Sequence, residues 1–146
     1  MNNDKYERGV EKFKEIKGEK AEEAIERLKD LNPDLARYVM EFPFGDVYSR
    51  PGLDLRSREI ATVAALITLG NAALQLKVHI RSALNVGVSR QEITEIIIQM
   101  AVYAGFPAAL NAIRAAKEVF SEIDEKEESE KLEYLKREKV IPRLIR

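Results

Sequence analysis

Charged residues are distributed unevenly along the chain. Residues 60–76 and 96–113 contain no Asp, Glu, Lys or Arg, although 34% of the chain is charged. Glycine and amide residues interrupt both stretches, so neither reaches the roughly 20 apolar residues that cross a bilayer as one helix. No run alternates between apolar and polar residues with the period of two that marks a strand. The pattern therefore predicts an all-α protein with a core of buried helices and no membrane span.

Cap and turn residues divide the chain into predicted helices. The strongest signal is Ser89 followed by Glu92, a capping box that satisfies backbone donors at a helix start. Gly70 suits the left-handed position that ends a helix, and Asn32-Pro33 suits a helix start. The expected elements are helices over residues 4–18, 19–31, 32–42, 54–69, 71–87, 89–104 and 107–120, with a loop over 44–52.

A chain of 146 residues is long enough for one domain with a single core. Residues 1–121 are expected to form this helical domain. Residues 122–146 begin with a very polar stretch, which predicts an exposed helix or a tail, and residues 140–145 are apolar enough to dock on a neighbour.

Composition excludes several functional classes. A formal net charge of −1 gives no general attraction to nucleic acid or to an anionic membrane. The absence of cysteine excludes disulfides and thiol redox chemistry, and a single histidine argues against a metal site. The N-terminus has no apolar signal region, which indicates a cytoplasmic protein. Abundant Glu and Lys hint at a thermophilic source.

The single histidine, His79, lies on one of the apolar predicted helices. A tight turn at Gly70 should pack this helix antiparallel to the preceding one, which carries Glu59. Glu59 lies about 11 residues before the turn and His79 about 8 after it. At roughly 1.5 Å rise per residue their levels differ by about 4 to 5 Å, so the carboxylate can reach the imidazole. Gln75 shares the face of His79, and Tyr103 belongs to a second ladder on a later helix.

A pocket walled by Glu59, Gln75, His79 and a member of that ladder is one interpretation, and packing is the other. A lone histidine on an apolar helix is commonly a hydrogen-bonded core residue. Glu59 suits the first turn of its helix, where a carboxylate complements the helix dipole, and Tyr103 suits a core ring. Whether His79 faces a cavity together with Glu59 separates the two interpretations.

Four segments together resemble the carboxymuconolactone decarboxylase family, part of the alkylhydroperoxidase D-like superfamily. The similarity extends from Leu53 to Phe120, a family-like core over residues 53–120. The segments are Leu55–Ile60, His79–Gly87, Ser89–Gln99 and Tyr103–Ala109. The resemblance implies an alkylhydroperoxidase D-like bundle of six to seven helices that assembles as a homotrimer or homohexamer. The apolar stretches agree, because they offer more apolar surface than one small core needs.

The superfamily resemblance has two chemical branches. Peroxidase-type members carry Glu-x-x-Cys-x-x-Cys-x-x-x-His, and here Leu69, Ala72 and Gln75 stand where that motif has the glutamate and the two cysteines. The chain therefore resembles the cysteine-free decarboxylase branch. This branch implies decarboxylation of a small lactone carboxylic acid without metal or organic cofactor, with His79 and Glu59 as catalytic residues.

Three functions remain open from the sequence. In the decarboxylase, the imidazole could supply a proton and Gln75 or Tyr103 could hydrogen-bond the lactone. A substrate carboxylate could be held by Arg56, Arg58 or Arg81. The second function is an enzyme of the same fold with another small substrate, including a peroxidase or antioxidant role that does not use the Cys-x-x-Cys route. The third is a non-catalytic helical oligomer that binds a ligand.

Overall fold

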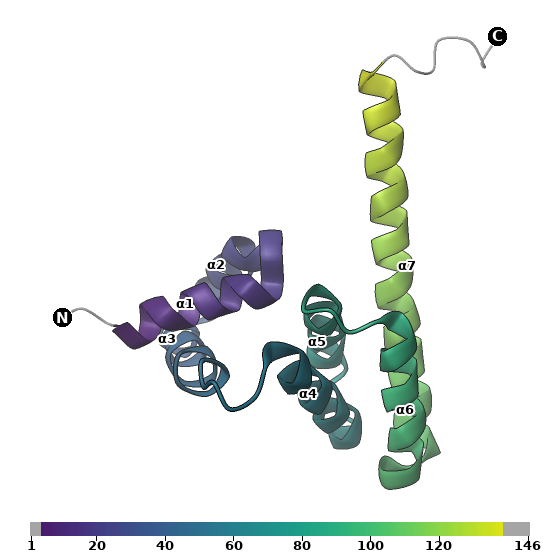
Figure 1. The fold of residues 1–146 in the computed structure, drawn as a ribbon, viewed down its shortest axis with the longest axis horizontal. Coiled ribbons are helices and arrows are strands. Elements are labelled where there is room, and N and C mark those ends of the chain that lie inside the picture. Colours follow the sequence, from purple (N-terminus) through teal and green to yellow (C-terminus); the bar gives the residue numbers. More distant parts are fainter. Residues whose placement is uncertain (1–3, 139–146) are drawn as a thin grey trace.

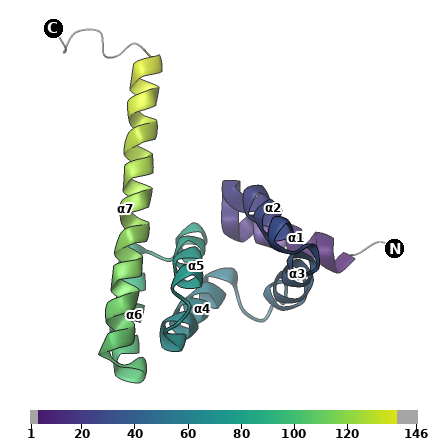
Figure 2. The ribbon, with the colours of Figure 1, turned by 180° about the vertical axis from the view of Figure 1, so that it is seen from behind.

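The computed structural model describes residues 4–138. Within this range the chain is helical and contains no strand, so the all-α prediction is confirmed. Figures 1 and 2 show two groups of helices, with α1 to α3 on one side and α4 to α7 on the other. The elements in order are α1 (Asp4–Lys17), η1 (Gly18–Lys20), α2 (Ala21–Leu31), α3 (Pro33–Val39), η2 (Met40–Tyr48), α4 (Leu55–Leu69), α5 (Ala73–Asn85), α6 (Arg90–Ala104) and α7 (Phe106–Arg137).

Each group of helices has its own apolar core. The first is built by α1, α2 and η2 around Phe13, Ile16 and Met40. The second is built by α4 to α7 around residues such as Val63 and Ile80, which are fully buried. Apolar residues at helical spacing supply both cores, as the sequence pattern predicts. None of the helices within residues 4–138 is long and apolar enough to cross a membrane.

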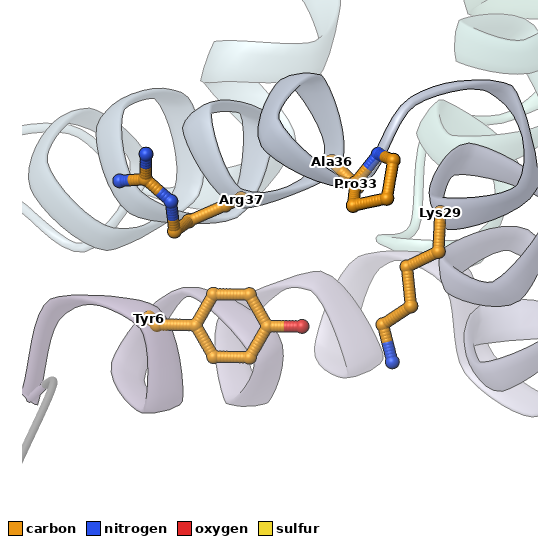
Figure 3. A pocket seen from close by; sticks show the side chains of 5 residues that line it. All are labelled: Tyr6, Lys29, Pro33, Ala36 and Arg37. Carbon is orange, nitrogen blue, oxygen red and sulfur yellow. The ribbon is translucent and has the colours of Figure 1, made fainter.

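The first group encloses a surface cavity of about 350 Å³ between α1, α2 and α3 (Figure 3). It is lined by Tyr6, Lys29, Pro33, Ala36 and Arg37. Its two cations already have acidic partners, since Lys29 pairs with Glu26 at 2.8 Å and Arg37 with Glu41 at 3.1 Å. Charged ligands are therefore not drawn to it by an uncompensated cation.

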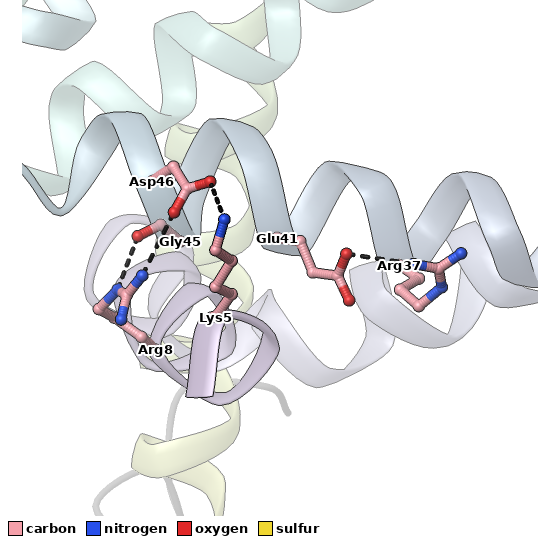
Figure 4. Close-up of polar contacts among 6 residues, drawn as sticks. All are labelled: Lys5, Arg8, Arg37, Glu41, Gly45 and Asp46. Carbon is pink, nitrogen blue, oxygen red and sulfur yellow. Dashed lines mark hydrogen bonds and ion pairs between the residues drawn. The ribbon is translucent and has the colours of Figure 1, made fainter. Parts of the chain in front are cut away.

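Helices α1 and η2 approach each other backbone to backbone. A Cβ atom added to Gly9 would lie 1.9 Å from the carbonyl oxygen of Met40, and one added to Gly45 would lie 2.4 Å from that of Lys5. Only glycine permits this spacing. Figure 4 shows Lys5 and Arg8 of α1 reaching Asp46 and the Gly45 carbonyl of η2. These ion pairs are largely exposed and stabilise little, so the close backbone packing fixes this contact.

The prediction that the third helix stops before Pro43 is wrong, and the predicted loop over residues 44–52 is confirmed only for residues 49–52. Residues Met40–Tyr48 form a π-helix, with Pro43 inside it. Met40 is fully buried and Phe44 packs edge-on against Phe13, with ring centroids 4.9 Å apart. Burying these two side chains outweighs the amide donor that Pro43 lacks, so tertiary packing overrides the local signal.

Helices α4 and α5 form the hairpin that the sequence predicts. The Asp54 side chain accepts a hydrogen bond from the Ser57 amide at 2.8 Å and caps α4, and Gly70 ends it with φ of 71°. The predicted helix over residues 71–87 begins two residues later than expected, because α5 starts at Ala73 after Ala72, which makes no side-chain cap. The chain uses residues 70–72 to reverse direction, which moves the helix start beyond Asn71.

Helix α6 begins at the predicted capping box, where Ser89 and Glu92 exchange hydrogen bonds. Helix α7 then runs without a break over 32 residues, through the stretch predicted as a polar helix or tail. Its second half projects away from the other helices (Figure 1) and leaves Tyr134 63% exposed. Residues 140–145, for which docking on a neighbour is predicted, lie outside the described range.

Candidate active site

The structure brings Glu59 and His79 into direct contact across the α4–α5 hairpin. His79 Nδ1 lies 2.9 Å from Glu59 Oε2. The Glu59 side chain is completely buried, whereas that of His79 is 20% exposed. The prediction that the Glu59 carboxylate can reach the His79 imidazole is thus confirmed. The pair extends from the core to the surface.

The two nitrogens of the imidazole have different surroundings. A carboxylate can only accept a hydrogen bond, so with Glu59 ionised the proton of the contact sits on Nδ1. Nε2 has no hydrogen-bond partner within residues 4–138, and it is not among the buried unpaired atoms, so it is open to a small molecule. Glu59 orients the ring and His79 presents a nitrogen that can exchange protons, as in other carboxylate–histidine arrangements.

Lys17 of α1 is a third ionisable group at this place. Its Nζ donates to Ser82 Oγ at 2.6 Å, and Ser82 lies one turn beyond His79 on α5 and is fully buried. Burial lowers the pKa of Lys17 to about 8, and the negative charge of Glu59 opposes this shift. The charge of Lys17 is therefore costly to bury and is partly compensated by the carboxylate.

Tyr48 of η2 approaches the same carboxylate from another side. Its hydroxyl lies 2.8 Å from Thr62 Oγ1, and Thr62 follows Glu59 by one turn on α4. Burial raises the pKa of the Tyr48 phenol, and the charge of Glu59 adds to the rise. One oxygen of Glu59, Oε1, is buried without a hydrogen-bond partner among the described residues. An unpaired buried oxygen of this kind costs about 1–3 kcal/mol, and a catalytic role is one of the reasons for which a folded protein retains such a group.

The three predicted substrate-binding residues lie apart from this contact. Gln75 is exposed on α5, and Tyr103 is 76% exposed near the end of α6. Arg56 pairs with Glu92 of α6 and donates to the Gly87 carbonyl at 3.4 Å. None of them shows a hydrogen bond to Glu59 or His79, so their binding roles stay predictions.

The two best-defined cavities of residues 4–138 do not form the pocket predicted around His79. The 350 Å³ cavity lies between α1, α2 and α3, and a second, of about 30 Å³, is lined by residues such as Leu66 and Ala112. Neither includes Glu59 or His79. In a single chain the partly exposed His79 ring reaches the surface above a buried carboxylate.

Sequence reasoning missed four members of the cluster: Lys17, Tyr48, Thr62 and Ser82. Thr62 and Ser82 could have been found, because each lies three residues after a predicted catalytic residue and so shares its helix face. Lys17 and Tyr48 come from the first group of helices, and no local pattern reveals their approach. No group of three or more His, Cys, Asp or Glu side chains able to hold a metal ion occurs in residues 4–138.

Comparison with known proteins identifies the family of the chain. A profile of the carboxymuconolactone decarboxylase family matches residues 33–118, more than half of the chain and the whole of α4 to α6. The chain belongs to this family.

Curated relatives include decarboxylases. The chain is 38% identical over 120 residues to 4-carboxymuconolactone decarboxylase of Acinetobacter baylyi, covering 82% of this chain and 89% of that protein. It is 30% identical over 124 residues to nitrosuccinic acid decarboxylase of Metarhizium robertsii, covering 84% and 86%. It is also 35% identical over 99 residues to an uncharacterised 15.0 kDa protein of Paracoccus denitrificans, covering 67% and 74%.

Proposed function

We propose that this protein is a decarboxylase of a small carboxylic acid, in the first place a lactone carboxylate, and that it uses no cofactor. The observation that carries the proposal is the contact of 2.9 Å between the buried Glu59 carboxylate and a histidine whose second nitrogen is open. Family membership adds independent support, because two relatives bear the names of decarboxylases.

The chemistry needs an electron acceptor in the substrate and a proton donor in the protein. When the C–C bond to the carboxylate breaks, CO2 leaves and the electron pair passes into the lactone carbonyl as an enolate. The imidazolium form of His79 then gives the proton on Nε2 to carbon and returns to the neutral ring. Glu59 stabilises the imidazolium through Nδ1, and the exposed edge of the ring regains a proton from water.

The names of the two relatives support this class of substrate. One denotes an acid with a lactone and the other an acid with a nitro group. Either group can accept an electron pair from a departing carboxylate. A common requirement follows for this chain, namely a substrate whose carboxylate lies close to such a group.

Incubation with the two acids tests the proposal directly. Carboxymuconolactone and nitrosuccinate are followed by 13C NMR for loss of the carboxyl carbon, beside a peroxide-consumption assay with a dithiol. We expect CO2 release from at least one acid, lost in a folded His79→Ala variant and kept in Lys14→Met, an exposed site on α1. Peroxide consumption without CO2 release would favour the redox alternative, and no turnover in either assay would favour a ligand-binding oligomer.

We also propose that the protein works as a homotrimer or homohexamer. Large apolar side chains are exposed on one chain, and Val78, 42% exposed, adjoins His79 in sequence. Contact with a second copy would bury such residues and would enclose the partly exposed ring of His79. The exposed set on α4 to α7 includes Leu69, Leu74, Val78, Ile98, Val102, Tyr103, Phe106 and Leu110.

A further inference from the structure

Lys17 of α1 is held near the site by a hydrogen bond to a residue of another helix, Ser82 of α5. The Ser82 hydroxyl donates its proton to the Val78 carbonyl at 3.0 Å, so its oxygen is free to accept from the Lys17 ammonium at 2.6 Å. The Phe13 ring lies 5.7 Å from the same nitrogen. A charged side chain is thus fixed beside a buried serine and an aromatic ring, where water cannot replace its partners freely.

This inference rests on the proposed function, in which Glu59 is ionised although it is completely buried. A buried negative charge needs a nearby positive charge to compensate it. We propose that Lys17 is a positioning residue of the Glu59–His79 pair: its ammonium group, anchored by Ser82, compensates the buried carboxylate and makes the imidazolium a better proton donor.

The physical reason is the sum of charges in the cluster. Glu59 carries one negative charge, Lys17 one positive charge, and His79 is neutral or positive. With Lys17 present the cluster is neutral around a neutral imidazole, and a proton added to His79 leaves it with a net positive charge. Repulsion between the two cations, in surroundings of low polarity, favours release of that proton to the substrate carbanion.

Other charged groups near the site do not provide the same compensation. On α4, Arg58 donates to the carbonyls of Leu53 and Arg50 and lies 5.9 Å from the Tyr48 ring. On α5, Lys77 and Arg81 pair with Glu118 and Glu122 of α7. Tyr48 on η2 is a phenol whose ionisation the charge of Glu59 opposes. For Lys17, by contrast, the charge of Glu59 raises the pKa against the effect of burial and so acts as a stabilising partner.

The single histidine of the chain makes the test unambiguous, because every imidazole signal in the NMR spectrum belongs to His79. The ring signals are titrated without substrate in the wild type, Lys17→Met, Lys17→Arg and Lys14→Met. Loss of the nearby cation should move the titration midpoint upward by about half a unit or more, since a removed charge no longer repels the imidazolium. Lys17→Arg and the exposed Lys14→Met should titrate like the wild type.

Chemical rescue separates charge from packing. The chain has no cysteine, so Lys17→Cys introduces a single thiol. Alkylation with 2-bromoethylamine restores an ammonium on a side chain of lysine length, whereas iodoacetamide adds a neutral group of similar bulk. We expect the first product to recover the wild-type midpoint and the second to keep the shifted one. A structural role alone would leave both products alike.

Turnover assays then show which proposal fails, if one does. With an active substrate, Lys17→Met should lower kcat by about threefold, the most that a half-unit change in the proton affinity of the donor allows, and shift its pH profile upward, with a smaller change in KM. An unchanged titration midpoint and pH profile in folded Lys17→Met would overturn the role of Lys17, even if the wild type is an active decarboxylase. A shifted midpoint in a protein that decarboxylates neither acid would refute the proposed function and leave the charge coupling standing.

Discussion

The buried ammonium of Lys17 predicts a specific dependence of stability on pH. Its pKa is about 8 in the folded protein against 10.5 for the free side chain, because burial disfavours the charged form. Between these two values the unfolded chain binds more protons than the folded one. Stability therefore rises with pH across this window, and the gain is complete above 10.5.

The size of the effect follows from the two pKa values. A shift of one unit corresponds to about 1.4 kcal/mol, and the lysine contributes about 2.5 kcal/mol to the free energy of unfolding between pH 7 and pH 10. Partial exposure of Lys17 screens its charge, which reduces the expected contribution to about 1–2 kcal/mol.

The assay compares urea unfolding of the wild type and Lys17→Met at equal chain concentration from pH 7 to pH 10. The difference between them removes the titration of all other groups, and Met replaces the lysine stem with an apolar chain of similar length. We expect the free energy of unfolding of the wild type to increase relative to that of Lys17→Met as pH rises. The difference between the wild type and Lys14→Met should stay constant. If the difference in free energy of unfolding between wild type and Lys17→Met stays constant or falls as pH rises, this ammonium is not buried in solution.

Three further predictions concern the pair, the helix contact and the apolar surface. Glu59→Gln should lower kcat by about 100-fold in steady-state decarboxylation while KM changes less, because the ring loses its anionic partner; unchanged kcat would contradict this. Gly9→Ala should lower the free energy of unfolding by about 2–4 kcal/mol in urea, since its Cβ would overlap the Met40 carbonyl, whereas the open site at Gly52 should tolerate alanine. Val102→Glu, at a side chain 78% exposed in one chain, should reduce the mass measured by light scattering, and an unaltered assembly would exclude this face as the interface.

Local signals in the sequence predict the second group of helices well. The capping box at Ser89, the cap at Asp54 and the left-handed Gly70 set the ends of α4 and α6. Because α4 and α5 are joined by a short turn, counting residues from the turn was enough to bring Glu59 and His79 together. Contacts of this kind depend on helix geometry alone.

Contacts between the two groups of helices were beyond such reasoning. Tyr48 reaches the site only because η2 continues through Pro43 as a π-helix, and this depends on packing against α1. Lys17 precedes Ser82 by 65 positions, and no periodic pattern links them. Side chains that meet through the packing of separate layers carry no shared signature in one sequence.

Lys17 lies on α1, whereas Glu59 and His79 lie on α4 and α5. The family profile matches residues 33–118, so the helix that bears Lys17 lies outside the matched segment. Gly9 seats this helix against η2, and Lys17 stands about 12 Å further along it, at roughly 1.5 Å per residue. The proposed role of Lys17 would set the proton affinity of the centre from a helix that carries neither Glu59 nor His79.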